Sequence, residues 1–322
     1  MKRIALLFAL SLFSSQTLAE TTPDFVNLPT SQLSDYLDTF KHQQQSVWFD
    51  YRGQRYPLQL VDISEGALFV RFEQGLLWID FDFETGPGAS VLMLQNAPLD
   101  QDPRQLFGRS EDIWVSSQVR VTEQGDNFLY QGQMRLNGSP SEPFQLSMNE
   151  SLVSAGTSEF TVQGNQALLA GELGTNTYLQ LSKLVKQQPQ VDTIVIQSVY
   201  GSLNDEINMH TGRLLRQSGL NTVIPRDGFA YSGGVDLFVA GVKRNVEPGA
   251  KVGVHSWCCI EGVTAADLPR NDPAHHDQLV YFNQMLAEKG REFYYYTLHA
   301  APYDGIHEMS DDEINEFSLI TK

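Results

Sequence analysis

The sequence is poor in cysteine, and this shortage excludes one class of fold. Only two cysteines occur among 322 residues, and they are adjacent, Cys258 and Cys259. Because adjacent residues close no long loop, a fold held together by disulfides is excluded. In an oxidising compartment the pair could form a redox-labile vicinal disulfide, although two small residues in a loop is the favoured interpretation.

Basic residues and long apolar runs are also scarce. Lys and Arg total 22 against 39 Asp and Glu, a formal net charge of -17, so we expect no nucleic-acid partner held by phosphate neutralisation. No apolar run reaches the roughly 20 residues that a bilayer-spanning helix needs, so stable membrane insertion is not expected. His275, His276, His299 and His307 lack the spacing of metal ligands, so neither a metal nor a cofactor is expected.

Residues 1–19 have the organisation of a secretory signal peptide. Lys2 and Arg3 form a basic start, residues 4–13 are almost wholly apolar, and Thr17 and Ala19 precede the expected cleavage site. The apolar run is too short to span a membrane. We therefore expect export to the bacterial periplasm, with full secretion as the second choice.

The rest of the chain divides into two parts with different patterns of apolar and polar residues, which together predict an α+β protein. Residues 20–165 show alternating apolar and polar residues between short turn signals, which predicts an antiparallel β-rich accessory domain with one helix near residues 31–40. Residues 166–322 alternate strand and helix patterns, which predicts an α/β domain. We expect strands at 167–171, 191–197, 221–224, 250–255 and 317–321, and helices at 175–187, 202–218, 230–241 and 277–298.

Three segments of the second half bring together groups suited to acyl chemistry. A strand breaks at Tyr200 and Gly201 before a helix, and the free N–H groups of such a turn can stabilise an oxyanion. Ser232 stands before Gly233 at the start of another helix, where the macrodipole favours an alkoxide. His255 ends a strand and can serve as the base for Ser232.

These segments resemble a known family. Residues 196–203, residues 228–241 and residues 244–257 are similar to the oxyanion turn, the nucleophile helix and the histidine segment of the Clp protease proteolytic subunit and its crotonase-superfold relatives. The likeness is greatest to the periplasmic Clp-like branch and covers about residues 166–322, the predicted Clp/crotonase-like domain. The paired glycines of the family's turn are replaced here by Tyr200 and Gly201.

The resemblance implies a periplasmic serine hydrolase, in particular a peptidase that acts on a peptide or protein. It assigns Ser232 as nucleophile, His255 as base and Asp304 as the nearest candidate for the third catalytic residue, with the oxyanion hole at Gly233, Tyr200 and Gly201. Ring-forming features of the family do not carry over, and homo-oligomerisation stays open.

Alternatives to this assignment stay open. Asp236 is one helical turn from Ser232 and is a second acidic candidate. Lys243 is disfavoured as the base because eleven residues of continuous helix rise about 16 Å. The chain could also be a non-catalytic Clp-like binding or scaffolding protein of the cell envelope. Acyl-CoA chemistry, known in the same superfold, is disfavoured by the expected export.

Overall fold

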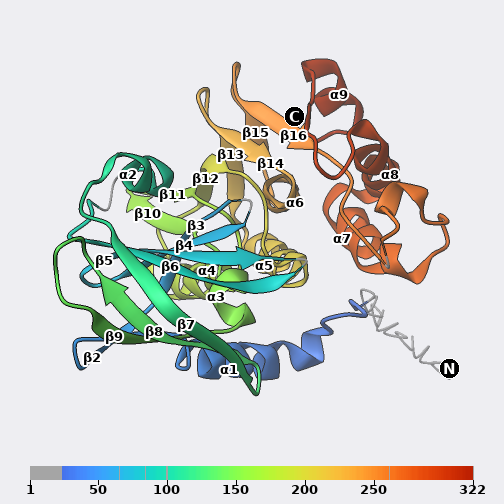
Figure 1. The fold of residues 1–322 in the computed structure, drawn as a ribbon. Helices are drawn as coiled ribbons and strands as arrows, with labels where there is room; N and C mark the ends of the chain where they lie inside the picture. Colours follow the sequence, from blue (N-terminus) through green and yellow to red (C-terminus); the bar gives the residue numbers. More distant parts are fainter. Residues whose placement is uncertain (1–23, 65, 84, 99–100, 261, 322) are drawn as a thin grey trace, which may run out of the picture.

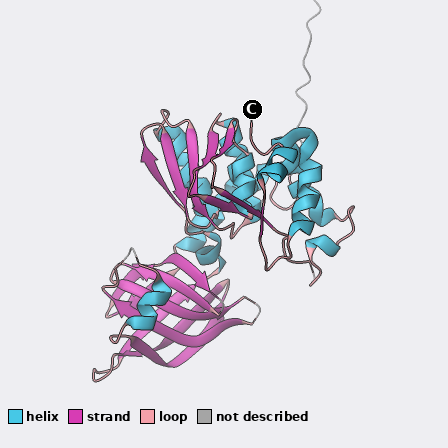
Figure 2. Ribbon diagram, turned by 90° about the horizontal axis from the view of Figure 1, so that it is seen from above, coloured by secondary structure: helices cyan, strands magenta, loops and turns pink. Residues whose placement is uncertain are grey.

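Two β-sheets and the helices around them form the structure, a computed structural model that describes residues 24–64, 66–83, 85–98, 101–260 and 262–321 (Figure 1). The fold is mixed α/β, with a large antiparallel sheet in the first half of the chain. Figure 2 shows this antiparallel sheet as a body of strands beside the mixed body of the second half. The expected signal peptide lies outside the described residues.

The first sheet is a meander of antiparallel strands. Within the described residues it contains nine strands in the order β2-β1-β9-β8-β7-β6-β5-β4-β3. Its end strands β2 and β3 are joined through Leu58 alone, so the sheet curls until its ends meet in one continuous segment. The strands are β1 (Trp48–Tyr51), β2 (Gln54–Pro57), β3 (Gln59–Ser64), β4 (Ala67–Phe72), β5 (Gly75–Asp82), β6 (Gly86–Gln95), β7 (Trp114–Gln124), β8 (Asn127–Arg135) and β9 (Glu142–Met148).

Apolar side chains fill the inside of this curl. Phe49, Leu77 and Tyr130 are fully buried. Strands β4 and β5 begin with consecutive buried residues, whereas β1 alternates buried and half-buried positions. Such alternation is what a sheet with one buried face requires. Short helices flank the sheet: η1 (Thr30–Gln32), α1 (Leu33–Gln44), α2 (Pro103–Arg109) and α3 (Glu150–Ser154).

The second sheet is mainly parallel and is branched. Strand β12 pairs with β13 through residues 193–195 and with β14 through residues 198–199, and β13 and β14 continue to β15 and β16. In the described part of the chain this sheet has eight strands. They are β10 (Glu159–Gln163), β11 (Gln166–Ala170), β12 (Thr193–Val199), β13 (Asn221–Ile224), β14 (Phe229–Tyr231), β15 (Arg244–Val246), β16 (Lys251–Val254) and β17 (His307–Glu308).

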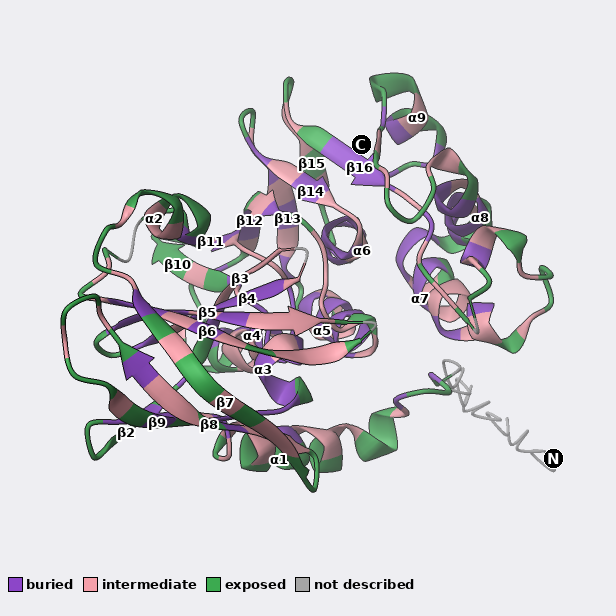
Figure 3. Ribbon diagram, viewed as in Figure 1, coloured by how far each residue is buried: buried purple, intermediate pink, exposed green. Residues whose placement is uncertain are grey.

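Helices pack around the branched sheet. Helix α6 is mostly buried between the branches and the other helices (Figure 3). The helices are α4 (Thr175–Gln187), α5 (Asp205–Gln217), α6 (Gly233–Val239), α7 (His276–Leu286), α8 (Gly290–Ala300) and α9 (Asp311–Glu316), with short turns η2 (Ala265–Asp267), η3 (Pro273–His275) and η4 (Ala287–Lys289). No helix in the described residues combines the length and apolarity needed to cross a membrane.

Three predicted elements differ from the structure in kind or continuity, and the bounds of the others agree to within four residues. The predicted helix 230–241 begins as strand β14 and becomes helical only at Gly233, because the backbone turns sharply at Ser232. The predicted helix 277–298 is interrupted at Ala287, where φ is 50°. The predicted strand 317–321 is wrong: this segment follows α9 as a turn whose carbonyls accept hydrogen bonds from Arg244.

Candidate active site

Ser232 occupies a sharp turn between strand β14 and helix α6. Its backbone has φ 51° and ψ -126°, a conformation that costs energy for a residue other than glycine and that clusters at functional sites. The Ser232 N–H donates to the Gly253 carbonyl at 2.9 Å, which ties the turn to strand β16. Its hydroxyl makes no capping hydrogen bond to α6. The turn thus presents, at a helix N-terminus, a hydroxyl without a hydrogen bond to any residue that the structure describes.

The two glycines after Ser232 permit a close approach between helix α6 and the end of strand β12. A Cβ at Gly233 would lie 2.5 Å from Ser202 Cβ, and one at Gly234 would lie 2.8 Å from Val199 Cγ1. Contacts this short do not occur between packed carbon atoms, so only glycine fits at both positions. The first N–H groups of α6 have no partner within the helix.

The turn predicted to form an oxyanion hole lies against Ser232. A Cβ at Gly201 would be 3.4 Å from Ser232 Cβ and 3.7 Å from Ser232 Oγ. The Gly201 carbonyl accepts a hydrogen bond from Leu173 N–H at 2.9 Å, which fixes the turn to the segment after β11. The Tyr200 side chain is 62% exposed and packs edge-on against Phe229. The structure therefore brings Gly201, Gly233 and Ser232 together.

His255 follows strand β16 directly and is half-buried. Its Nδ1 lies 3.0 Å from the Tyr303 carbonyl oxygen, so Nδ1–H donates and Nε2 is left with its lone pair. Burial lowers the pKa of His255, while the hydrogen bond to Tyr303 acts in the opposite direction. The imidazole is thereby held neutral near pH 7, in the tautomer that can accept a proton.

Ser232 and His255 line one small cavity of about 40 Å³. The described part of the chain contains no hydrogen bond between Ser232 Oγ and His255. Catalytic hydrogen bonds commonly tighten only in the complex with substrate. The cavity is lined by Asp205, Ser232, Gly233, Asp236, Val254, His255, Trp257, Gln278, Phe282 and Thr297.

The three other candidates for proton transfer are placed differently. Asp304 is exposed in a turn, and the contact expected between its carboxylate and His255 Nδ1 is made by the carbonyl of Tyr303 instead. Lys243 is exposed beyond the end of α6 and does not line the cavity. Asp236 does line it, and burial together with the neighbouring Asp205 raises the pKa of Asp236 well above its usual value.

Sequence reasoning missed several residues around the site. Asn208 on α5 is 2% exposed and donates from Nδ2 to the Gly233 carbonyl at 2.9 Å, which fixes the residue after Ser232 to α5. Trp257 and Phe282 line the cavity from a loop and from α7. Only Asn208 could have been suspected from the sequence, because it lies in the first turns of the helix that follows Gly201. The other contacts depend on packing between distant segments.

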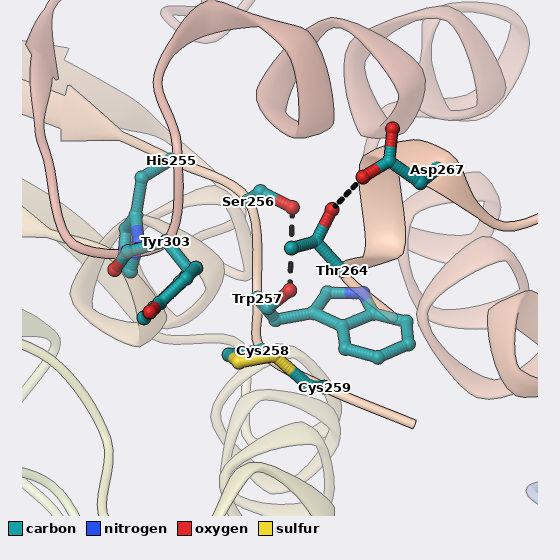
Figure 4. The surroundings of a disulfide bond; sticks show 8 residues. All are labelled: His255, Ser256, Trp257, Cys258, Cys259, Thr264, Asp267 and Tyr303. Carbon is teal, nitrogen blue, oxygen red and sulfur yellow. Dashed lines mark hydrogen bonds between the residues drawn. A yellow bond between two sulfur atoms is a disulfide. The ribbon is translucent and has the colours of Figure 1, made fainter. Parts of the chain in front are cut away.

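The adjacent cysteines are joined. Cys258 and Cys259 form a disulfide, so the favoured interpretation as two unpaired loop residues is wrong and the vicinal alternative holds in this structure. The disulfide follows Trp257 in the loop that leaves His255 (Figure 4). One wall of the cavity therefore belongs to a disulfide-bearing loop.

Comparisons with known proteins add a partial likeness. No protein-family model matches the chain, and no curated protein sequence matches it. Among solved structures, a serine-to-alanine mutant of the 1510-N membrane-bound stomatin-specific protease is 16% identical, with a TM-score of 0.36 over 49% of this chain and 79% of that chain. A lysine-to-alanine mutant of the 1510-N protease in complex with a substrate peptide is 16% identical, with a TM-score of 0.34 over 48% and 71%.

Proposed function

We propose that the protein is a serine hydrolase, in particular a peptidase, with Ser232 as nucleophile and His255 as base. The observation that carries the proposal is the strained turn at Ser232, which shares a cavity with a half-buried histidine whose Nδ1 is already hydrogen-bonded. A free hydroxyl beside an oriented neutral imidazole is the arrangement that nucleophilic acyl transfer needs.

The proposed reaction proceeds through an acyl-enzyme. Ser232 Oγ forms a bond to the carbonyl carbon while its proton passes to His255 Nε2, and the N–H groups of Gly233 and the Tyr200–Gly201 turn hold the oxyanion. His255 then gives that proton to the leaving amine as the C–N bond breaks. Water then attacks the carbonyl carbon of the acyl-enzyme while its proton passes to His255 Nε2. His255 returns this proton to Ser232 Oγ as the acyl C–O bond breaks, which releases the acid. The Tyr303 carbonyl takes the orienting place that a carboxylate holds in a Ser-His-Asp triad.

A second cavity supports an extended substrate. It has a volume of about 510 Å³ and is lined from both sheets, by Asp62 of β3 as well as by Ser198 and Tyr200 at the end of β12. Since Tyr200 adjoins the proposed oxyanion turn, a chain bound along this cavity would pass the nucleophile. This placement supports a peptide or protein over a small ester as substrate.

Covalent labelling with a fluorophosphonate tests the hydrolase. The wild-type protein should be labelled, while Ser232→Ala should abolish labelling and His255→Ala should slow it at least about 100-fold. Ser218→Ala, a change at an exposed position after α5, is the matched control and should label normally. Wild-type protein that is folded yet unlabelled would contradict the proposal.

A non-catalytic binding protein of the cell envelope is the second candidate. The missing hydrogen bond between Ser232 and His255 favours it. In that case peptides would bind wild-type protein and Ser232→Ala equally well, and neither would be labelled or would release product.

We also propose that residues 166–322 form a Clp/crotonase-like domain and that the chain is exported to the periplasm. The branched parallel sheet and the Ser232 turn support the first proposal, and the pattern of residues 1–19 supports the second. Sequencing the N-terminus of protein recovered from a periplasmic extract tests export: a mature chain that starts near Glu20 is expected, and an intact Met1 in the cytoplasm would contradict it.

A further inference from the structure

The cavity beside Ser232 and His255 is small enough to select a substrate. Its volume of about 40 Å³ contrasts with the 510 Å³ of the cavity beside Tyr200. A single water needs roughly 10–15 Å³ of such space, so the small cavity holds about three waters. An occupying side chain is therefore limited to about three non-hydrogen atoms.

The position of the cavity identifies which part of a substrate would enter it. A carbonyl carbon attacked by Ser232 must lie roughly 3–3.5 Å from Oγ. The side chain of the residue that supplies this carbonyl starts at Cβ, two bonds further away. Because Ser232 and His255 themselves line the cavity, this side chain is the group closest to its entrance.

The aromatic walls of the cavity are held in place from behind. Trp257 Nε1 donates to Tyr294 Oη at 3.1 Å, and that hydroxyl bonds His275 Nδ1 at 2.6 Å. Phe282 is 3% exposed and stacks on the ring of Tyr294. Neither wall can retreat without disturbing a buried cluster. A larger side chain thus meets resistance rather than an adaptable pocket.

The polar part of the wall does not change this limit. Asp205 and Asp236 could attract a cationic side chain, but a lysine or arginine has more atoms than the cavity accepts. Burial, and to a smaller extent the neighbouring Asp205, holds the pKa of Asp236 high, which favours its neutral form.

We propose that this cavity is the subsite for the side chain that precedes the cleaved bond, and that it admits side chains the size of alanine or serine, with valine at the limit. The inference rests on the proposed function and deepens it by naming the substrate class: peptides with a small residue at that position. Trp257, Phe282 and Thr297 are the residues that set the limit.

Peptidyl diphenyl phosphonates with alanine, valine, leucine, phenylalanine or lysine at the reacting position test the proposal. Ser232 Oγ displaces phenoxide from phosphorus, so the labelling rate reports how each side chain fits. The alanine compound should label at least about tenfold faster than the leucine, phenylalanine and lysine compounds. A faster reaction with leucine, phenylalanine or lysine, or no reaction with alanine, would overturn the proposal.

Wall variants make the test independent of a single compound. Thr297→Ala and Phe282→Ala should each raise the leucine-to-alanine rate ratio several-fold, and Thr297→Ala covers the case in which the Phe282 variant does not fold. Leu181→Ala is the matched control, because Leu181 on α4 is fully buried in the same core without lining the cavity. A small fluorophosphonate, which has no such side chain, separates the two proposals: if it fails to label, the hydrolase itself is refuted, whereas normal labelling with the wrong phosphonate order refutes only the subsite.

Discussion

His255 Nδ1 lies 3.0 Å from the carbonyl oxygen of Tyr303, the residue before Asp304. A backbone carbonyl fixes the imidazole tautomer as a carboxylate does, but it carries no full charge to stabilise the imidazolium. We therefore expect the base to be oriented by the main chain of the loop between α8 and β17.

The Asp304 side chain should be dispensable. Asp304→Ala is expected to change the rate of fluorophosphonate labelling less than about threefold, because the hydrogen bond to His255 comes from the preceding carbonyl. The loss in a Ser-His-Asp triad, by comparison, is about 10⁴-fold. Labelling of Asp304→Ala and wild type at matched concentration measures this, and a loss beyond about 100-fold would restore Asp304 as the third catalytic residue.

A methyl group at Gly201 should block the reaction without unfolding the protein. The added Cβ of Gly201→Ala would lie 3.7 Å from Ser232 Oγ, an ordinary contact that nonetheless occupies space a substrate carbonyl needs. We expect at least about a tenfold lower labelling rate at an unchanged melting temperature. Gly108→Ala, where a Cβ meets no atom within 4 Å, is the control. Equal labelling of both variants would place the oxyanion site elsewhere.

A methyl group at Gly233 should instead destabilise the fold. Its Cβ would lie 2.5 Å from Ser202 Cβ, and overpacking of this kind costs about 1–3 kcal/mol. Chemical denaturation of Gly233→Ala measures the loss in free energy of unfolding. Because the shortest contact is with the Ser202 side chain, Ser202→Gly in the same protein should recover part of the loss, while the contacts with Asn208 Nδ2 and the Ser202 N–H remain. A double variant no more stable than Gly233→Ala would contradict this packing.

The pH dependence of labelling should report the His255 imidazole. Burial lowers the pKa of His255 below 6.5, and only the neutral ring accepts a proton. The labelling rate should therefore rise with pH through a midpoint below 6.5 and level off near pH 7. Rates measured from pH 4.5 to 8 give the midpoint. A midpoint above 6.5, or the same profile in His255→Ala, would show that another group titrates.

Asp236 should make stability depend on pH. Its pKa in the folded protein is raised, by burial first and by Asp205 second, above the unfolded value of about 3.9. Below about pH 4 both states are protonated and Asp236 contributes nothing. As pH rises further the unfolded chain releases the proton first, so stability falls until the folded pKa is passed. Asp236→Asn should thus stabilise more at pH 8 than at pH 4. Melting temperatures at both pH values test this, with the exposed Asp227→Asn as the control expected to show no such difference.

The sequence was most informative where structure depends on local periodicity. Helix α4 and strand β13 have their predicted bounds, because an amphipathic repeat and a short β-branched run each determine one local structure. In residues 230–241, by contrast, the sequence did not show where strand β14 ends and helix α6 begins. A strand and a buried helix have the same apolar composition, and the sharp bend at Ser232 that separates them comes from packing against Gly253 and Ser202.

The sequence predicted that Ser232 and His255 lie close together, and they line one cavity, but it did not predict the residues that support them. Ser232 and His255 stand in recognisable local patterns. The Tyr303 carbonyl has no side-chain signature, and Asn208, Trp257 and Phe282 reach the site from α5, a loop and α7 only through the tertiary fold. The break at Ala287, which separates α7 from α8, is marked in the sequence by Gly290 alone, where a Cβ would clash with the Phe282 carbonyl oxygen.

The curled first sheet imposes an order on folding. Trp48 of β1 pairs with Ser147 of β9. Strand β1 therefore cannot complete its pairing until about a hundred further residues have been synthesised. Pairings of this sequence separation form slowly, because the intervening chain must first be ordered. Until β9 arrives, one edge of β1 stays open to the wrong partners. We therefore expect the nascent chain to benefit from a chaperone that covers its first strands until β9 has paired with β1.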